Sequence, residues 1–230
     1  MFYRVPAFLG ATLLLLVISQ GPATADEFIR IATFNIANLG DRDEYSRSLI
    51  ALTNIVLKTE ADLVAIQEVE PNQLGQDQVE RLVDLLNVAS AHYGMQPYTH
   101  AISPEHIGDE TTAFVWRNPV ELLGEIELLS HDADPDGDGL RTFQRVPSIA
   151  PFRAGTYDFL VVNCHLYTKV EGVSSEGRRA ELEVLAIWLR SLPSETEKDA
   201  VVLGDFNRFL NDSSRTTWTA FMPFDHEQHY

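Results

Sequence analysis

Four short apolar stretches, each ending abruptly in polar residues, constrain this chain more than any other feature of its sequence. The apolar stretches are 31–34, 63–66, 160–162 and 201–203, and their polar ends are Asn35, Gln67–Glu68, Asn163–Cys164–His165 and Gly204–Asp205–Phe206–Asn207. Short continuous apolar runs of this kind predict buried strands. Buried strands whose polar ends converge can build a site at one rim of a sheet.

The hydrophobic spacing elsewhere alternates between the periods of helices and strands. Val79, Leu82, Val83 and Leu86 follow the i, i+3, i+4, i+7 spacing of an amphipathic helix. The same reasoning predicts helices at 45–57, 78–89 and 176–192, and strands at 28–35, 62–67, 111–117, 120–129, 157–166 and 200–203. We expect strands 111–117 and 120–129 to be neighbours, turned at Asn118–Pro119. A length of 230 residues predicts one domain, or at most two small ones.

The first 25 residues have the order of a secretory signal peptide. Arg4 supplies a positive charge, the apolar stretch is densest at 13–18, and Ala23–Thr24–Ala25 is a small-residue cleavage site. The alternative is an uncleaved N-terminal anchor, but the apolar run is short for a membrane span. We therefore expect a signal peptide over residues 1–25, a domain over 26–230, a secreted or periplasmic location and no stable membrane anchor after cleavage.

The charge and the cysteine count narrow the classes of function. The formal net charge is −17, which disfavours a protein that coats nucleic acid without specificity. A phosphate-bearing substrate must then be met by bound cations or by a local basic patch. Cys164 is the single cysteine, so no intrachain disulfide can form. Its place in an apolar strand favours a buried, inert thiol over a nucleophile.

The polar strand ends favour a divalent cation. Burying a lone carboxylate costs on the order of several kcal/mol, so Glu68 and Asp205 at the ends of apolar strands call for a positive partner. Oxygen ligands without a cysteine cluster favour Mg²⁺, with Mn²⁺ or Ca²⁺ as alternatives. His165 can donate to phosphate oxygens as charge develops. Asn35 and Asn207 can orient a carboxylate, a ligand or a nucleophile.

Taken in order, these segments resemble the successive motifs of the endonuclease/exonuclease/phosphatase superfamily, to which deoxyribonuclease-like enzymes belong. The resemblance covers residues 28–210. The resemblance implies a four-layer α/β sandwich with two mixed sheets flanked by helices. It implies that Glu68 is the principal metal ligand, and that Asn35 supports the metal site and contacts substrate. It further implies that His165 stabilises the phosphoryl transition state. Asp205 and Asn207 would position the attacking water and the phosphate.

Arg145 lies in a segment, 143–147, that is similar to an Arg-x-Pro strand segment of the superfamily. By this resemblance Arg145 would contact substrate phosphate, which suits an otherwise acidic protein. A surface arginine without that role is an equally weighted alternative.

Two features depart from known patterns. The superfamily ends its domain with a Ser-Asp-His segment, whereas Asp225–His226 is the only late Asp-His pair here and follows Phe224. We expect a C-terminally truncated copy, with a shortened C-terminus that still reaches the site as the alternative. The acidic segment 132–139 begins like a calcium loop but lacks its closing Glu, so we expect a solvated loop, with a weak extracellular Ca²⁺ site as the alternative.

The sequence as a whole predicts an exported, monomeric, metal-dependent hydrolase of phosphoester bonds, with nucleic acid as the favoured substrate. One alternative is a sphingomyelinase-like enzyme or another small-substrate phosphodiesterase or phosphatase. The second alternative is a catalytically impaired remnant, or a binding module on the same fold.

Overall fold

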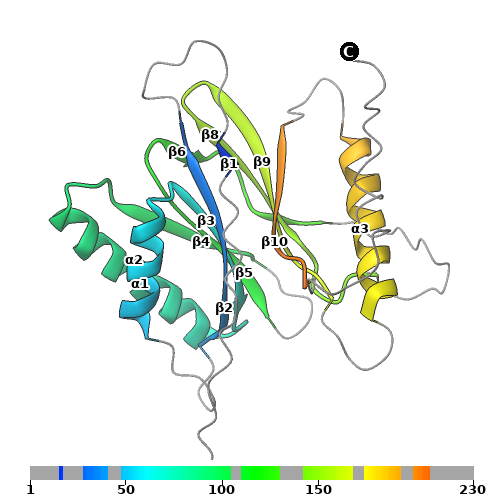
Figure 1. Ribbon diagram of the computed structural model, residues 1–230, viewed down its shortest axis with the longest axis horizontal. Helices are drawn as coiled ribbons and strands as arrows, with labels where there is room; N and C mark the ends of the chain where they lie inside the picture. Colours follow the sequence, from blue (N-terminus) through cyan, green and yellow to red (C-terminus); the bar gives the residue numbers. More distant parts are fainter. Residues whose placement is uncertain are drawn as a thin grey trace, which may run out of the picture.

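Two mixed β-sheets lie face to face between layers of helix, as Figure 1 shows for the computed structural model. The structure describes residues 16–17, 28–40, 48–104, 110–129, 142–167, 174–192 and 199–207. The helices are α1 (Leu49–Thr59), α2 (Gln73–His92) and α3 (Ser174–Ser191). Helices α1 and α2 cover one outer face and α3 covers the other, which confirms the predicted four-layer sandwich.

The first sheet has the strand order β1-β2-β3-β5-β4. Its strands are β1 (Leu16–Val17), β2 (Arg30–Leu39), β3 (Leu63–Val69), β4 (Tyr98–Ile102) and β5 (Thr111–Arg117). Strands β2 and β3 run parallel, and β5 runs antiparallel to β3. The ends of β2 and β3 and the beginning of β5 therefore lie at the same edge.

The second sheet has the order β10-β9-β8-β6, with β7 also paired to β8. Its strands are β6 (Val120–Leu122), β7 (Glu127–Leu128), β8 (Ser148–Ala154), β9 (Tyr157–His165) and β10 (Ala200–Asp205). Strands β9 and β10 are parallel, with Asp205 opposite His165, and β8 is antiparallel to β9. The ends of β9 and β10 and the beginning of β8 share one edge.

Alternation along β3 explains why its sequence is apolar throughout. Leu63 and Ala65 face the core between the sheets, whereas Val64 and Ile66 face α1 and α2. Successive side chains of a strand point to opposite faces. A strand covered on both faces therefore needs apolar residues at every position.

Aromatic side chains fill the centre between the sheets. Phe152 of β8 contacts Phe114 and Trp116 of the first sheet edge to face, with ring centroids 5.6 and 5.4 Å away. It also stacks with Phe159 of β9 at 6.2 Å. Rings in such pairs add to the stabilisation that burial alone provides.

The first two helices begin at side-chain caps. Ser48 accepts the backbone N–H of Ala51 at the start of α1, and Asn72 accepts that of Gly75 at the start of α2. These caps satisfy backbone donors that have no partner within the helix. The predicted amphipathic face of α2 is confirmed, since all four of its named apolar residues are buried in the core beneath it.

One topological expectation was wrong. Residues 120–129 form two short strands, β6 and β7, in the second sheet, and so they do not pair with β5. Strand β5 pairs with β3 along one edge and with β4 along the other. No edge of β5 remains for a hairpin partner, and the chain crosses to the other sheet after Arg117.

Several sequence predictions fall outside the described residues. They include most of the signal peptide, the acidic segment 132–139 and the pair Asp225–His226, and they stay predictions. Within 1–25 the structure describes Leu16–Val17, which pair antiparallel with the beginning of β2. No helix among the described residues has the length and hydropathy needed to cross a bilayer.

Candidate active site

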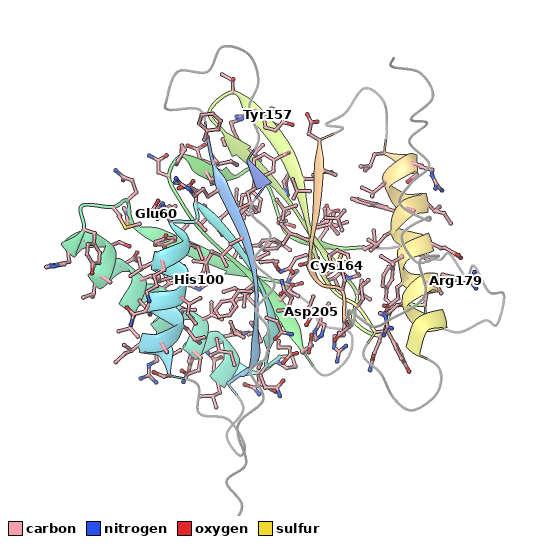
Figure 2. All side chains as sticks on the ribbon, viewed as in Figure 1. Glu60, His100, Tyr157, Cys164, Arg179 and Asp205 are labelled. Carbon is pink, nitrogen blue, oxygen red and sulfur yellow. The ribbon has the colours of Figure 1, made fainter. Side chains whose placement is uncertain are left out.

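At one edge of the sandwich, the layer between the sheets changes from apolar to polar. Along β9, Phe159 and Val161 lie in the inter-sheet core, and Asn163 and His165 continue the same face. Along β10, Asp205 continues the face that begins with Val201 and Leu203. Figure 2 places Asp205 at this rim, at the opposite end of the sheets from Tyr157.

A buried hydrogen-bonded layer lies directly beneath the rim. Gln67 Nε2 donates to Asn163 Oδ1 at 2.6 Å and to Thr33 Oγ1 at 2.9 Å. Asn163 Nδ2 donates to the backbone carbonyls of Ile66 and Ala113 at 3.0 and 3.3 Å. These bonds join β9 to strands of the first sheet and fix how the two sheets dock, because buried polar groups require specific partners.

Asn35 joins carboxylates from both sheets. Its Nδ2 donates to Glu68 Oε1 at 2.7 Å and to Asp205 Oδ2 at 2.8 Å. Its Oδ1 accepts the backbone N–H of Ala37 at 2.9 Å, which fixes the orientation of the amide. Three residues that the sequence singled out therefore meet, and Asn35 directs its donors toward the two carboxylates.

Irregular backbone conformations direct the side chain of Glu68 toward this cluster. Glu68 has φ 62°, and Ala37 and Asn38 on the neighbouring strand have φ 53° and 57°. The pairing register shifts at the same places, after Asn35 in β2 and after Ile66 in β3. Left-handed backbone at a residue other than glycine costs on the order of 1 kcal/mol and is enriched at functional sites. Such bulges redirect side chains next to active sites.

A glycine before Asp205 allows β10 to approach β9 closely. Gly204 has φ 140°, and a Cβ at this position would lie 1.8 Å from the backbone oxygen of Cys164. Any other residue would collide with β9, so the Gly-Asp pair is required by packing as well as by the site.

His165 lies between Glu110 on one side and the carboxylate cluster on the other. Its Nδ1 is hydrogen-bonded to Glu110 Oε1. Its Nε2 lies 3.8 Å from Glu68 Oε1 and 4.0 Å from Asp205 Oδ2, and it forms no hydrogen bond with any residue that the structure describes. The side chain is only 2% exposed. A buried polar nitrogen without a partner requires an explanation, and a ligand oxygen would provide one.

Glu110 also connects His165 to Arg145. Arg145 Nε lies 3.2 Å from Glu110 Oε2, and both side chains are largely buried. Arg145 thus lies beside the cluster, largely buried, and is not the surface arginine of the alternative. The sequence reasoning missed Glu110. Glu110 directly precedes strand 111–117. Because this strand runs antiparallel to β3, its beginning lies at the edge of the sheet that carries Glu68.

The donor set fits a small divalent cation. Ligand atoms of Glu68, Glu110 and His165 all lie within 4.8 Å of one another, and Asp205 adjoins them. Among the described residues, three carboxylates at the site face one guanidinium and one imidazole, so negative charge is in excess. Mg²⁺ is typically held by one or two carboxylates and keeps waters or phosphate oxygens as its other ligands. Because Glu110 is engaged by His165 and Arg145, Glu68 and Asp205 are the carboxylates most suited to the ion.

Asn207 lies beside the site and supports its geometry. Its backbone N–H donates to Asp205 Oδ1 at 2.8 Å, and its Nδ2 donates to the backbone carbonyl of Leu166 at 2.6 Å. Its side-chain amide nitrogen is therefore committed to the end of β9. A direct catalytic role for Asn207 stays a prediction.

Cys164 is buried, as predicted, on the face of β9 that packs against α3. It lies opposite Gly204 of β10, and Figure 2 labels it in the second sheet near Asp205. Burial strongly raises the pKa of its thiol. A thiolate nucleophile at this position is therefore disfavoured.

The carboxyl of Glu181 is fully buried on α3, and burial raises its pKa from the usual 4.5 to about 7. Two backbone N–H groups, Arg145 and His165 oppose this shift. Since the folded-state pKa is raised, the folded chain keeps a proton that the unfolded chain releases. The stability gained from this group is therefore complete below pH 4.5 and is lost as pH rises to about 7.

We expect this titration to appear in the difference between the wild-type protein and Glu181→Gln. The difference in free energy of unfolding should change by roughly 3 kcal/mol between pH 4.5 and pH 8. Urea unfolding at several pH values measures it. Glu183→Gln, on the same helix but partly exposed, serves as the control. A wild-type-to-variant difference that is independent of pH would contradict the expectation.

Fold and site together define an α/β sandwich in which both sheets contribute acidic and polar side chains to one rim. The family model for the Endonuclease/Exonuclease/phosphatase family matches residues 32–226, and the chain belongs to this family. Members of this family are hydrolases, which supports a phosphoesterase kind of activity here. No curated protein matches the chain.

Solved structures share the fold at low sequence identity. The mannosyl-6-phosphatase of Bacteroides thetaiotaomicron is 16% identical with a TM-score of 0.58, and the match covers 84% of this chain and 70% of that chain. The human Nocturnin catalytic domain with bound sulfate is 17% identical with a TM-score of 0.57, covering 85% and 70%. A D. rerio TDP2 complexed with single-strand DNA product is 17% identical with a TM-score of 0.51, covering 79% and 61%.

Proposed function

We propose that this protein is a metal-dependent hydrolase of phosphoester bonds, and that nucleic acid is its substrate class. The observation that carries the proposal is the meeting of Asn35, Glu68, His165 and Asp205 from two sheets around one point. Three of these four side chains are charged or titratable. Their placement at the end of an apolar core has no evident structural benefit.

Glu68 is the proposed principal holder of the cation, and Asn35 fixes its carboxylate together with that of the adjoining Asp205. A bound divalent cation would neutralise charge on a phosphoryl group and lower the pKa of a coordinated water. The Nε2 of His165, which has no hydrogen-bond partner among the described residues, faces the same point. With both ring nitrogens protonated, the imidazolium can donate from Nδ1 to Glu110 and from Nε2 to a phosphoryl oxygen as negative charge builds there. Glu110 orients this imidazole and holds Arg145 beside it.

Asp205 is the carboxylate best placed to receive a proton from an attacking water. Its side chain is 32% exposed, against 18% for Glu68 and 9% for Glu110. Asn35 and the backbone N–H of Asn207 hold its two oxygens in place. A carboxylate fixed in this way and open to solvent can act as a general base.

The proposed substrate class, nucleic acid, draws on the charge of the chain and on its structural relatives. With a net charge of −17, a phosphate backbone must be met by the proposed cation or by local basic groups, of which Arg145 lies beside the site. The structural relatives include a TDP2 with single-strand DNA product and a mannosyl-6-phosphatase. A small phosphate ester or sphingomyelin is therefore the alternative substrate, and an impaired remnant is the alternative to an enzyme.

A panel of phosphoesters tests the proposal. We expect the purified chain with Mg²⁺ to nick supercoiled plasmid or degrade single-stranded DNA faster than it hydrolyses p-nitrophenyl phosphate or sphingomyelin. Excess chelator should abolish the activity, and added Mg²⁺ should restore it. Preferred hydrolysis of a small ester would assign the alternative substrate class. A folded protein that binds Mg²⁺ but cleaves nothing in the panel would favour the remnant.

We also propose export with cleavage after Ala25, on the basis of the charged, apolar and small-residue order of the N-terminus. N-terminal sequencing of the protein recovered outside the cytoplasm tests this directly. An intact N-terminus beginning at Met1 would contradict it.

A further inference from the structure

Glu181 is an acidic residue in the middle of an apolar surface. Its neighbours Leu182, Val184 and Leu185 belong to the core between α3 and the second sheet, and Glu181 itself is 0% exposed. Burial of a carboxylate is unfavourable unless specific groups compensate for it. The proposed chemistry at the rim does not use Glu181, so its presence requires another reason.

The two oxygens of Glu181 hold the backbones next to two rim residues. Glu181 Oε2 accepts the N–H of Tyr167 at 2.7 Å, two residues after His165. Glu181 Oε1 accepts the N–H of Gln144 at 3.1 Å, directly before Arg145. One carboxylate thus connects the end of β9 with the segment that enters β8.

The same pair of rim residues is connected a second time, on the side of the site. Glu110 bonds His165 Nδ1 with one oxygen and lies 3.2 Å from Arg145 Nε with the other. Glu110 therefore holds the side chains of His165 and Arg145, and Glu181 holds the backbone beside them through the N–H groups of Tyr167 and Gln144. Arg178 of α3 adds a bond from its NH1 to the Tyr167 carbonyl at 3.3 Å.

Only a carboxylate can satisfy this arrangement. Both N–H groups point at oxygen atoms, and an ionised carboxyl accepts on both. A glutamine offers one oxygen and places an NH₂ group against the other N–H. Substitution by Gln therefore removes one of the two backbone connections while it keeps the shape of the side chain.

We propose that Glu181 is a positioning residue that sets the placement of His165 relative to Arg145 for phosphoester hydrolysis. This inference rests on the proposed function for its catalytic consequence. The expected effect of Glu181 on the His165 imidazole is independent of the proposed function.

The first test is kinetic and uses Glu181→Gln with Glu183→Gln as the control on the same helix. With bis(p-nitrophenyl) phosphate and Mg²⁺, we expect Glu181→Gln to lower kcat about tenfold at pH 8, a size typical of groups that orient catalytic residues. KM should change little. The ratio of wild-type to variant kcat should shrink toward pH 6, as Glu181 in the wild-type protein gains a proton and comes to resemble Gln.

Other charged or titratable groups lie near Glu181 on α3 and on the elements packed against it, in the described part of the chain. They are Arg145 before β8, Cys164 and His165 on β9, and Arg178 on α3 itself. All four are present in both proteins. Glu183→Gln, which leaves Glu181 and all four of these groups in place, sets the reference for the ratio, and a ratio of wild-type to Glu181→Gln kcat that stays constant from pH 6 to pH 8 would overturn the proposal.

The second test does not depend on activity. The imidazole resonances of His165, assigned by their loss in His165→Asn, should move in Glu181→Gln and stay in place in Glu183→Gln. If the wild-type chain hydrolyses no phosphoester, the proposed function fails, and these resonances still decide the positioning role. Unchanged His165 resonances in Glu181→Gln would overturn it, even if the variant melts at a lower temperature, because that outcome indicates a purely structural role.

Discussion

Replacing Glu68 by Gln should lower phosphoester hydrolysis by about a thousandfold, because a metal ion contributes several kcal/mol to transition-state stabilisation and each tenfold in rate is about 1.4 kcal/mol. Gln keeps the size of the side chain and can still accept from Asn35 Nδ2, which lies 2.7 Å from Glu68 Oε1. The removed property is the negative charge. Measuring kcat/KM over a range of Mg²⁺ concentrations tests whether the loss accompanies weaker metal binding.

The melting temperature separates this effect from damage to the fold. Glu68 lies among the carboxylates of Glu110 and Asp205, so removing its charge relieves repulsion in the metal-free protein. We expect Glu68→Gln to melt no lower than the wild-type chain. Glu80→Gln, on the exposed face of α2, is the control and should retain full activity. Full activity in Glu68→Gln, or in excess chelator, would rule out the proposed mechanism.

Replacing Phe152 by Ala should lower the free energy of unfolding by about 3–5 kcal/mol, the range for a large buried aromatic residue. Phe152 is fully buried and contacts aromatic rings of both sheets. Its removal leaves a cavity between the sheets that rigid strands cannot close. Urea denaturation followed by tryptophan fluorescence and circular dichroism measures the change.

Phe28→Ala provides the matched control for this substitution. Phe28 is 45% exposed at the beginning of the described segment before β2, so the same truncation there should cost far less. Equal losses for the two variants would contradict the view that the inter-sheet aromatic cluster holds the two layers together.

The fold was predictable because its strands and helices carry their own signals. Apolar runs such as 63–66 identify strands that are covered on both faces, and the spacing in α2 identifies a helix with one covered face. Strand β8 gave a weaker signal, since Pro151 interrupts its apolar pattern. The structure places Pro151 between the positions paired to β7 and those paired to β6, where the missing N–H is tolerated.

The site was predictable in part, for reasons of geometry. Asn35 and Glu68 lie toward the ends of the parallel strands β2 and β3, and His165 and Asp205 end the parallel strands β9 and β10, so each pair shares one edge of its sheet. Packing of the two sheets face to face then brings the two pairs together. Glu110 precedes its strand, and its place in the site depends on the antiparallel pairing of β5 with β3. The hydrophobic pattern of a strand does not specify its direction, and so it could not identify Glu110.

Because the site is divided between the two sheets, it stays intact only while the sheets remain tightly packed against each other. Asn35 and Glu68 belong to one sheet, and His165 and Asp205 belong to the other. A compact state that retains its strands and helices but loses tight contact between the layers would separate these groups. Catalysis should therefore disappear before secondary structure does when the protein is warmed or mildly denatured.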